Sequence, residues 1–192
     1  MIKADTKIGF AFTGSFCTFD KVINELYELS LKYNNITPIM SPAAYNTDTR
    51  FGTARDFREK ISSICKREII STIPAAEPIG PQKLFDALII APCTGNTLAK
   101  LASAVTDTSV TMAAKAHLRN ERPLIIAPST NDGLGANAKN IGLLLNTKNI
   151  YFVPFGQDDP LKKHNSLVAD FSQIIPTLED ALQGKQIQPL LV

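Results

Sequence analysis

Long apolar runs are missing from this sequence of 192 residues. No stretch approaches the roughly 18 consecutive apolar residues that a membrane-spanning helix requires. The first residues, MIKAD, lead directly into a predicted strand and lack the charged-then-apolar layout of a secretory signal. The sequence therefore predicts a cytoplasmic protein that does not enter a membrane.

Residues that bind metals or form disulfides are also scarce. The three cysteines lie far apart and form no C-x-x-C pair, which argues against a zinc site and against a disulfide framework. There are two histidines, and the apolar helical spacing around His117 places that one in the core, so we expect no metal site. The net charge is only +2, and basic residues are scattered apart from one Lys-Lys pair at 162–163, so we expect no nucleic-acid partner.

Apolar residues make up 44% of the chain, which is long enough to bury a full core as one domain, residues 1–192. Apolar runs of strand length occur at 8–12, 36–40, 87–91, 124–127 and 150–153. These runs are nearly continuous rather than alternating, which is typical of parallel strands covered on both faces.

Segments with helical periodicity separate these runs, at 22–33, 57–64, 98–105, 110–117 and 134–145. Thr53 is the predicted N-cap of the second segment. The repeated strand-helix order predicts an α/β fold, a doubly wound parallel sheet with helices on both faces. We expect the tail, 156–192, to pack on this domain mainly as one or two helices, broken at Pro176.

Ligands of such sheets bind beyond the carboxyl ends of the strands, so the loops that follow the strands are the expected place for a site. The first loop reads TGSFCT at 13–18, and small residues before a helix N-terminus suit a phosphate. Its spacing from Gly9 resembles a P-loop, but the lysine is missing, and no G-x-G-x-x-G occurs, so nucleoside triphosphates and dinucleotides are disfavoured. The predicted phosphate-binding residues are Thr13, Gly14, Ser15 and, from the second loop, Ser41. The alternative is that these residues only cap helices.

The third and fourth loops read APCTGNT at 91–97 and APSTNDG at 127–133. Their small polar groups can meet the edge of a planar heterocycle without bringing charge into the site. Asp107 lies between them and is predicted to cap a helix or to contact the ring edge. The predicted ring-facing residues are Pro92, Thr94, Asn96, Thr97, Asp107, Pro128 and Ser129. Simple helix capping by Thr94 or Asn96 is again the alternative.

Residues 91–100 resemble the Pro-x-Ser-Ala-Asn-Thr segment of the FMN-dependent cysteine decarboxylase family, and 127–131 resemble its substrate-clamping Pro-x-Met-Asn segment. Residues 13–15 and Ser41 match the phosphate-binding positions of that family. The resemblance implies a flavodoxin-like fold, bound FMN, and a homo-oligomer, a trimer or a multiple of trimers, with the flavin near a subunit interface.

Longer motifs at 47–52, 76–81, 112–116, 154–160 and 188–192 resemble the B-subunit family of dipicolinate synthases. That resemblance implies conversion of dihydrodipicolinate to dipicolinate in the mother cell of a sporulating bacterium. It also implies a partner, the A subunit, as the carrier of the NAD(P) site.

The sequence departs from the decarboxylase pattern in two places. No histidine lies in 75–80, where the decarboxylases have one, and Thr130 stands where their clamp has Met. These departures favour oxidation of a dihydropyridine over decarboxylation, with a cofactor-free partner-binding protein as a third reading. Arg50 is our candidate for pairing with the two substrate carboxylates, although a surface ion pair is its alternative role. The weaker candidates for contacts with substrate are Asn96, Asn131 and Lys115.

Overall fold

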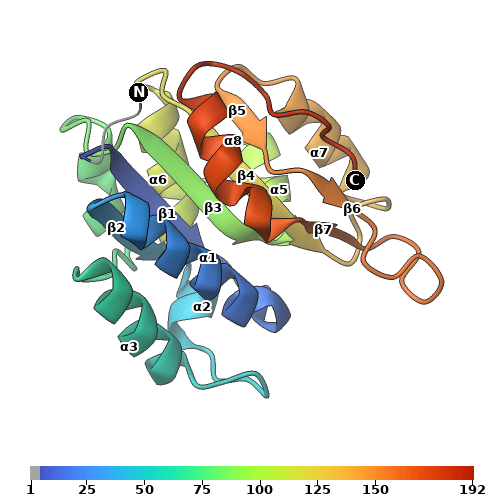
Figure 1. Cartoon of the computed structure of the whole chain (residues 1–192), viewed down its shortest axis with the longest axis horizontal. Helices are drawn as coiled ribbons and strands as arrows, with labels where there is room; N and C mark the ends of the chain where they lie inside the picture. Colours follow the sequence, from blue (N-terminus) through green and yellow to red (C-terminus); the bar gives the residue numbers. More distant parts are fainter. Residues whose placement is uncertain (1–4) are drawn as a thin grey trace.

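A seven-stranded sheet forms the centre of the molecule in the computed structural model, which describes residues 5–192 (Figure 1). Its parallel part consists of β1 (Lys7–Phe12), β2 (Asn35–Met40), β3 (Ala87–Cys93), β4 (Leu124–Thr130) and β5 (Ile150–Phe152). β1 pairs with β2 and β3, β3 with β4, and β4 with β5. This order, 2-1-3-4-5, is the flavodoxin-like one, and it confirms the predicted doubly wound sheet.

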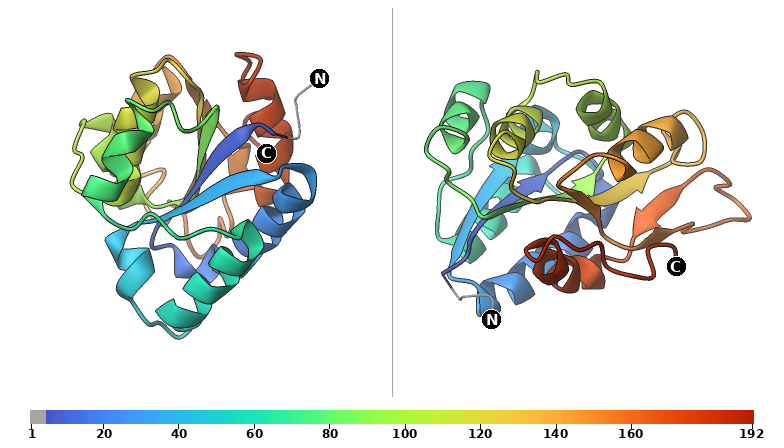
Figure 2. Two further views of the ribbon diagram at one scale, coloured as in Figure 1. Left: turned by 90° about the vertical axis from the view of Figure 1, so that its left-hand side faces the viewer. Right: turned by 90° about the horizontal axis from the view of Figure 1, so that it is seen from above.

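Helices cover both faces of this sheet, as its apolar strands require (Figure 2). One face carries α1 (Phe19–Lys32) and α8 (Ile174–Ala181), and the other carries α5 (Gly95–Ala102), α6 (Ser109–Leu118) and α7 (Ala138–Leu145). α3 (Ala54–Cys65) packs against α1 and β2, and Thr53 caps it as predicted. Every residue of β3 is buried between the two layers. Within residues 5–192, none of the helices is long and apolar enough to cross a membrane.

Short elements complete the connections between the strands. These are α2 (Pro42–Asn46), α4 (Ile73–Ala76) and the 3-10 turns η1 (Phe16–Thr18), η2 (Glu77–Ile79) and η3 (Phe171–Gln173). α7 begins four residues later than position 134, where the helical periodicity had placed it. Residues 131–137 form turns instead, and within them the Asp132 carboxylate accepts hydrogen bonds from Thr130 and Asn137.

The tail differs most from the prediction. β6 (Phe155–Gly156) and β7 (Leu167–Ala169) form an antiparallel extension of the sheet, with β7 paired to the end of β4. The expected helix break at Pro176 is wrong, since Pro176 lies in the first turn of α8. Backbone N–H groups in a first helical turn have no intrahelical partner, so proline loses no hydrogen bond there.

Gly9 lies in the middle of β1 rather than in a phosphate loop. A Cβ atom at this position would lie 2.7 Å from atoms of the Phe85 ring and of the Leu88 side chain. Close packing inside the core therefore explains this glycine, and its P-loop-like spacing from Gly14 has no bearing on ligand binding.

Candidate functional site

A cavity of about 510 Å³ opens at the carboxyl ends of β1, β2 and β3. This is the point where the strand order reverses, which is where open α/β sheets bind ligands. Three loops and the start of α6 line it, with the residues Thr13, Gly14, Ser41, Pro42, Ala43, Thr94, Asn96, Thr97, Lys100, Asp107 and Thr108. A larger hollow of about 580 Å³ lies between the ends of α1 and α3, at the amino end of β2. It is at the wrong end of the sheet for this kind of site.

Thr13 joins the first and third loops. Its hydroxyl donates to the Pro92 carbonyl oxygen at 2.6 Å and accepts from the Thr94 N–H at 2.9 Å. The side chain is almost fully buried, at 1% exposure. The hydroxyl of Thr13 is therefore committed to two backbone groups and holds the cavity walls together.

Helix capping accounts for three hydroxyls around the cavity. Ser41 Oγ accepts from the Ala44 N–H at 3.2 Å, and Thr94 Oγ1 accepts from the Thr97 N–H at 3.2 Å. Thr108 caps α6, so the prediction that Asp107 caps a helix is wrong. A capping hydroxyl still has a proton to donate, so the capping alternative and a ligand contact are compatible for Ser41. The Thr108 hydroxyl also bonds to the Thr111 hydroxyl, at 2.9 Å.

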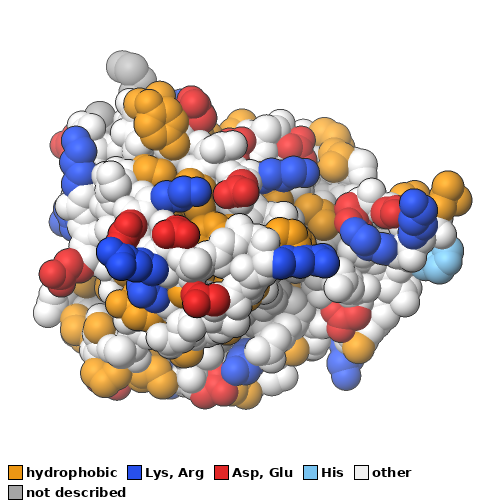
Figure 3. Space-filling model, turned by 90° about the horizontal axis from the view of Figure 1, so that it is seen from below, with side chains coloured by type: hydrophobic (Ala, Val, Ile, Leu, Met, Phe, Trp, Pro, Cys, Tyr) orange, Lys and Arg blue, Asp and Glu red, His pale blue; other side chains and the backbone are white. Residues whose placement is uncertain are grey.

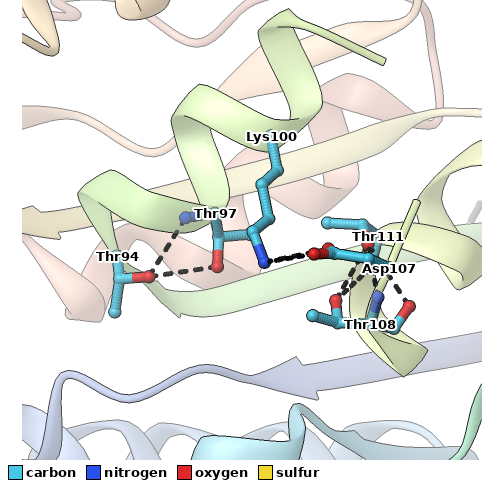
Figure 4. Close-up of polar contacts among 6 residues, drawn as sticks. All are labelled: Thr94, Thr97, Lys100, Asp107, Thr108 and Thr111. Atoms are coloured by element: carbon cyan, nitrogen blue, oxygen red, sulfur yellow. Dashed lines mark hydrogen bonds and ion pairs between the residues drawn. The ribbon is translucent and has the colours of Figure 1, made fainter. Parts of the chain in front are cut away.

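One ion pair lies at this cavity, between Lys100 on α5 and Asp107 ahead of α6 (Figure 4). Lys100 Nζ is 2.8 Å and 2.9 Å from the two carboxylate oxygens of Asp107. The hydrogen bond from Lys100 holds the pKa of Asp107 below its ordinary value. Lys100 is the single Lys, Arg or His among the lining residues.

Lys100 was not among the predicted site residues, although a signal for it was present. It follows Asn96 by four residues and Thr97 by three, which places all three on one face of a helix. Once Asn96 and Thr97 are assigned to a site on α5, Lys100 must lie beside them.

The space over Gly14 is open. A Cβ atom there would meet only a ring atom of Phe16 at 3.6 Å and the Cβ of Ala43 at 3.7 Å, so packing does not require a glycine. Within residues 5–192, no hydrogen bond engages the side-chain amide of Asn96, which is exposed. Open backbone, uncharged donors and one cation fit a phosphate ester attached to a planar heterocycle.

Comparison with known proteins agrees with this geometry. The family model described as Flavoprotein matches residues 2–174. The chain belongs to the Flavoprotein family. It is 46% identical to the B subunit of dipicolinate synthase from Bacillus subtilis (strain 168) over 186 residues, which cover 97% of this chain and 93% of that protein. These matches confirm the resemblances that the sequence motifs indicated.

Solved structures agree with the family assignment. The crystal structure of the dipicolinate synthase B subunit from Bacillus halodurans C has a TM-score of 0.92 and 44% identity, covering 100% of this chain and 98% of that one. The FMN-dependent cysteine decarboxylase SpaF, at 22% identity and a TM-score of 0.67, covers 94% of this chain and 97% of its own, and it shares the fold.

Other predicted site residues of this flavoprotein lie outside the cavity. The Ser15 hydroxyl bonds to the Ser129 hydroxyl at 2.7 Å, which ties the first loop to the end of β4. Pro92 and Pro128 are buried within β3 and β4. These four residues are not part of the cavity lining.

The exposed candidates for substrate contact do not line the cavity either. Arg50 lies at an exposed turn, with its guanidinium carbon 4.9 Å from the centre of the Phe51 ring. Asn131 is exposed beyond the end of β4. Lys115 lines a neighbouring hollow between α5 and α6, which Lys100 also lines. Among the predicted catalytic residues, the structure places only Asn96 in the cavity.

A polar cluster connects the fourth loop to α5. Asn137 Nδ2 donates to both carboxylate oxygens of Asp132, at 2.9 Å and 2.8 Å, and Thr130 donates to the same carboxylate. A Cβ atom on Gly95 would lie 2.5 Å from Asn137 Nδ2 and from the Thr130 hydroxyl oxygen. Gly95 is therefore required for the contact between the third and fourth loops, which explains a glycine that the motif alone left unexplained.

Proposed function

We propose that this chain is the flavin-binding B subunit of a dipicolinate synthase. It acts with an A subunit to convert dihydrodipicolinate to dipicolinate during sporulation, in the mother cell. The observation that carries the proposal is 46% identity over 97% of the chain to a protein of that name. The cavity supports it, because it lies where a flavodoxin-like sheet binds FMN and has the donors that FMN needs.

Aromatisation removes two electrons and two protons from the dihydropyridine ring. FMN, when bound, supplies a two-electron redox centre beside the substrate. In this proposal, the open backbone at Gly14 with the hydroxyl of Ser41 holds the phosphate. The Asn96 amide orients the ring edge. NAD(P), the final oxidant, belongs to the A subunit.

The proposal extends to assembly. Arg50 and Asn131 are exposed and outside the cavity of their own chain. We propose a homo-oligomer, a trimer or a multiple of trimers, in which they contact the cavity of a neighbouring copy. On the face seen from below in Figure 3, acidic and basic side chains are interspersed rather than segregated.

Native mass spectrometry of the purified chain tests the proposed stoichiometry, and a monomer at micromolar concentration would contradict it.

Reconstitution tests the function. The appearance of dipicolinate is followed by its ultraviolet absorbance, with each of the two proteins alone and with both together, in the presence of NAD(P)+. We expect rapid formation only with both. Full activity of the A subunit without this chain would refute the proposal. Release of carbon dioxide from a peptide with a C-terminal cysteine by this chain alone would favour a decarboxylase function instead.

Gly14→Ala separates binding from folding. The new methyl group has room, so we expect stability to stay the same or to rise by up to about 1 kcal/mol. It occupies the space proposed for the phosphate, so we expect FMN to bind about tenfold more weakly, or about 1.4 kcal/mol. Quenching of FMN fluorescence measures the affinity. The matched control is Gly142→Ala, where a Cβ meets nothing within 4 Å. Equal affinity in both variants would contradict the phosphate placement.

A further inference from the structure

We infer that Lys100 is the anion-binding residue of the cavity, and that Asp107 holds its ammonium group until an anionic oxygen group of the ligand takes the place of the carboxylate. This inference rests on the proposed function, because it assigns a role within the same cavity. It concerns a residue that the sequence motifs did not single out. In this inference Lys100 is paired with Asp107 in the empty cavity and with the ligand anion in the occupied one.

The position of Lys100 supports this role. The residue lies on the face of α5 that also presents Asn96 and Thr97, and all three line the cavity. Its side chain is 23% exposed, whereas that of Asp107 is 57% exposed. The lysine is therefore held in the cavity wall while its partner reaches it from the solvent side. Figure 4 shows the two side chains meeting between α5 and the start of α6.

The two ends of the pair differ in how firmly they are anchored. Lys100 lies in the last turn of α5, so its backbone belongs to a regular helix. Asp107 belongs to the irregular connection 103–108, just before the Thr108 cap. The start of α6 is anchored separately, because the Ser109 hydroxyl donates to the Met40 carbonyl oxygen at 2.5 Å. Asp107 can therefore turn toward water without undoing α6.

Charge balance gives the reason for exchange. The lining carries one basic and one acidic side chain, so an anion that enters while the pair is intact meets no net positive charge. Transfer of Lys100 from Asp107 to the ligand leaves the ammonium paired inside the cavity and the carboxylate in water. Neither state then leaves a charge desolvated and unpaired, which would be costly.

Two ligand groups have the required chemistry, the phosphate of FMN and a carboxylate of the dicarboxylate. Both present anionic oxygens that accept short, charge-assisted hydrogen bonds from an ammonium group. Riboflavin lacks the phosphate of FMN, and pyridine lacks the carboxylates of dipicolinate. Each pair of compounds therefore isolates one of the two groups.

The test measures the affinity of the full chain for FMN, riboflavin, dipicolinate and pyridine by calorimetric titration. Three variants are compared with the natural chain: Lys100→Met, Asp107→Asn and, as the matched control, Lys148→Met. Lys148 also forms an ion pair, with Glu121 at 3.4 Å, but it is 78% exposed and lies ahead of β5 at the opposite end of the sheet. Urea unfolding of each variant confirms that it is folded.

The exchange predicts opposite effects at the two ends of the pair. Lys100→Met should weaken binding of either FMN or dipicolinate by about tenfold or more. Binding of the matching uncharged compound, riboflavin or pyridine, should be unaffected. Asp107→Asn should tighten binding of the same anion by about threefold, because the competing charge is gone while an oxygen remains to hold Lys100. Lys148→Met should change neither.

The compound affected identifies the group that Lys100 binds. Loss with FMN but not riboflavin assigns the phosphate, and loss with dipicolinate assigns a carboxylate. Weaker binding in both Lys100→Met and Asp107→Asn would show that the ion pair only connects α5 to α6, and it would overturn the exchange. Unchanged binding in both variants would overturn it as well. A natural chain that binds FMN without supporting aromatisation would refute the proposed function alone. A natural chain that binds none of the four compounds would overturn both.

Discussion

Replacement of Thr13 by Val is expected to lower the free energy of unfolding by about 2–4 kcal/mol, although the two side chains have nearly the same shape. The Thr13 hydroxyl satisfies the Pro92 carbonyl and the Thr94 N–H at the end of β3. Valine leaves both backbone groups without this partner in a buried setting, and each unsatisfied group costs about 1–3 kcal/mol. Urea unfolding monitored by circular dichroism, at constant m-value, measures the change.

Thr13→Ser is the matched control, because it keeps the hydroxyl and loses only a methyl group. We expect it to cost about 1 kcal/mol. Flavin affinity should follow the same order, with Val weaker than Ser, since the hydroxyl joins the two loops that carry Gly14 and Asn96. Equal stability of the Val and Ser variants would show that the hydroxyl bridge contributes nothing.

The parallel part of the fold was predictable because each of its strands is a nearly continuous apolar run. The runs at 87–91 and 124–127 contain only buried residues in the structure, and burial on both faces is what such runs indicate. The antiparallel extension was not predictable in the same way. β6 has two residues and β7 three, so neither has a pattern of its own. β7 pairs with the end of β4 and β6 pairs with β7, so both strands depend on a contact between distant segments.

The cavity was predictable in location but only partly in composition. The loops that line it were identified from the rule that ligands bind beyond the carboxyl ends of strands. Which side chains face inward depends on contacts between distant segments, such as Ser15 with Ser129, 114 residues apart. Arg50 was chosen for its charge, and no local pattern shows which way an exposed turn faces. Lys100 was overlooked because it lies on the helix behind the loop, beyond the end of the loop motif.

Acidification is expected to destabilise the protein through His117. The imidazole is 1% exposed, and its Nε2 lies 3.0 Å from the Pro123 carbonyl oxygen, to which it must donate. Within the described part of the chain, Nδ1 has no hydrogen-bond partner. Burial lowers the pKa of His117 from its ordinary 6.5 to about 4, and Arg122 acts in the same direction, while the Pro123 hydrogen bond and Asp86 oppose it. A second proton, on Nδ1, would have no acceptor.

The direction of the pH effect follows from linkage. Above pH 6.5 the histidine is neutral in both the folded and unfolded states, so it contributes no pH dependence. Between pH 6.5 and 4 the histidine is protonated in the unfolded chain but neutral in the folded protein. The free energy of unfolding therefore decreases as the pH is lowered, by up to about 1.4 kcal/mol per pH unit. From pH 7 to pH 5, this contribution is about 2 kcal/mol.

His117→Gln removes the titration while keeping an amide that can donate to Pro123. Urea unfolding at pH 7 and pH 5 should show a loss for the natural chain that exceeds the loss for this variant by about 2 kcal/mol. Leu178→Ala is the control for destabilisation without titration, because Leu178 is fully buried in α8 and carries no charge. It should lower stability at both pH values and retain the full pH dependence of the natural chain. An equal loss from pH 7 to pH 5 in the natural chain and in His117→Gln would show that the buried imidazole is protonated in the folded state, and that Nδ1 finds an acceptor on protonation.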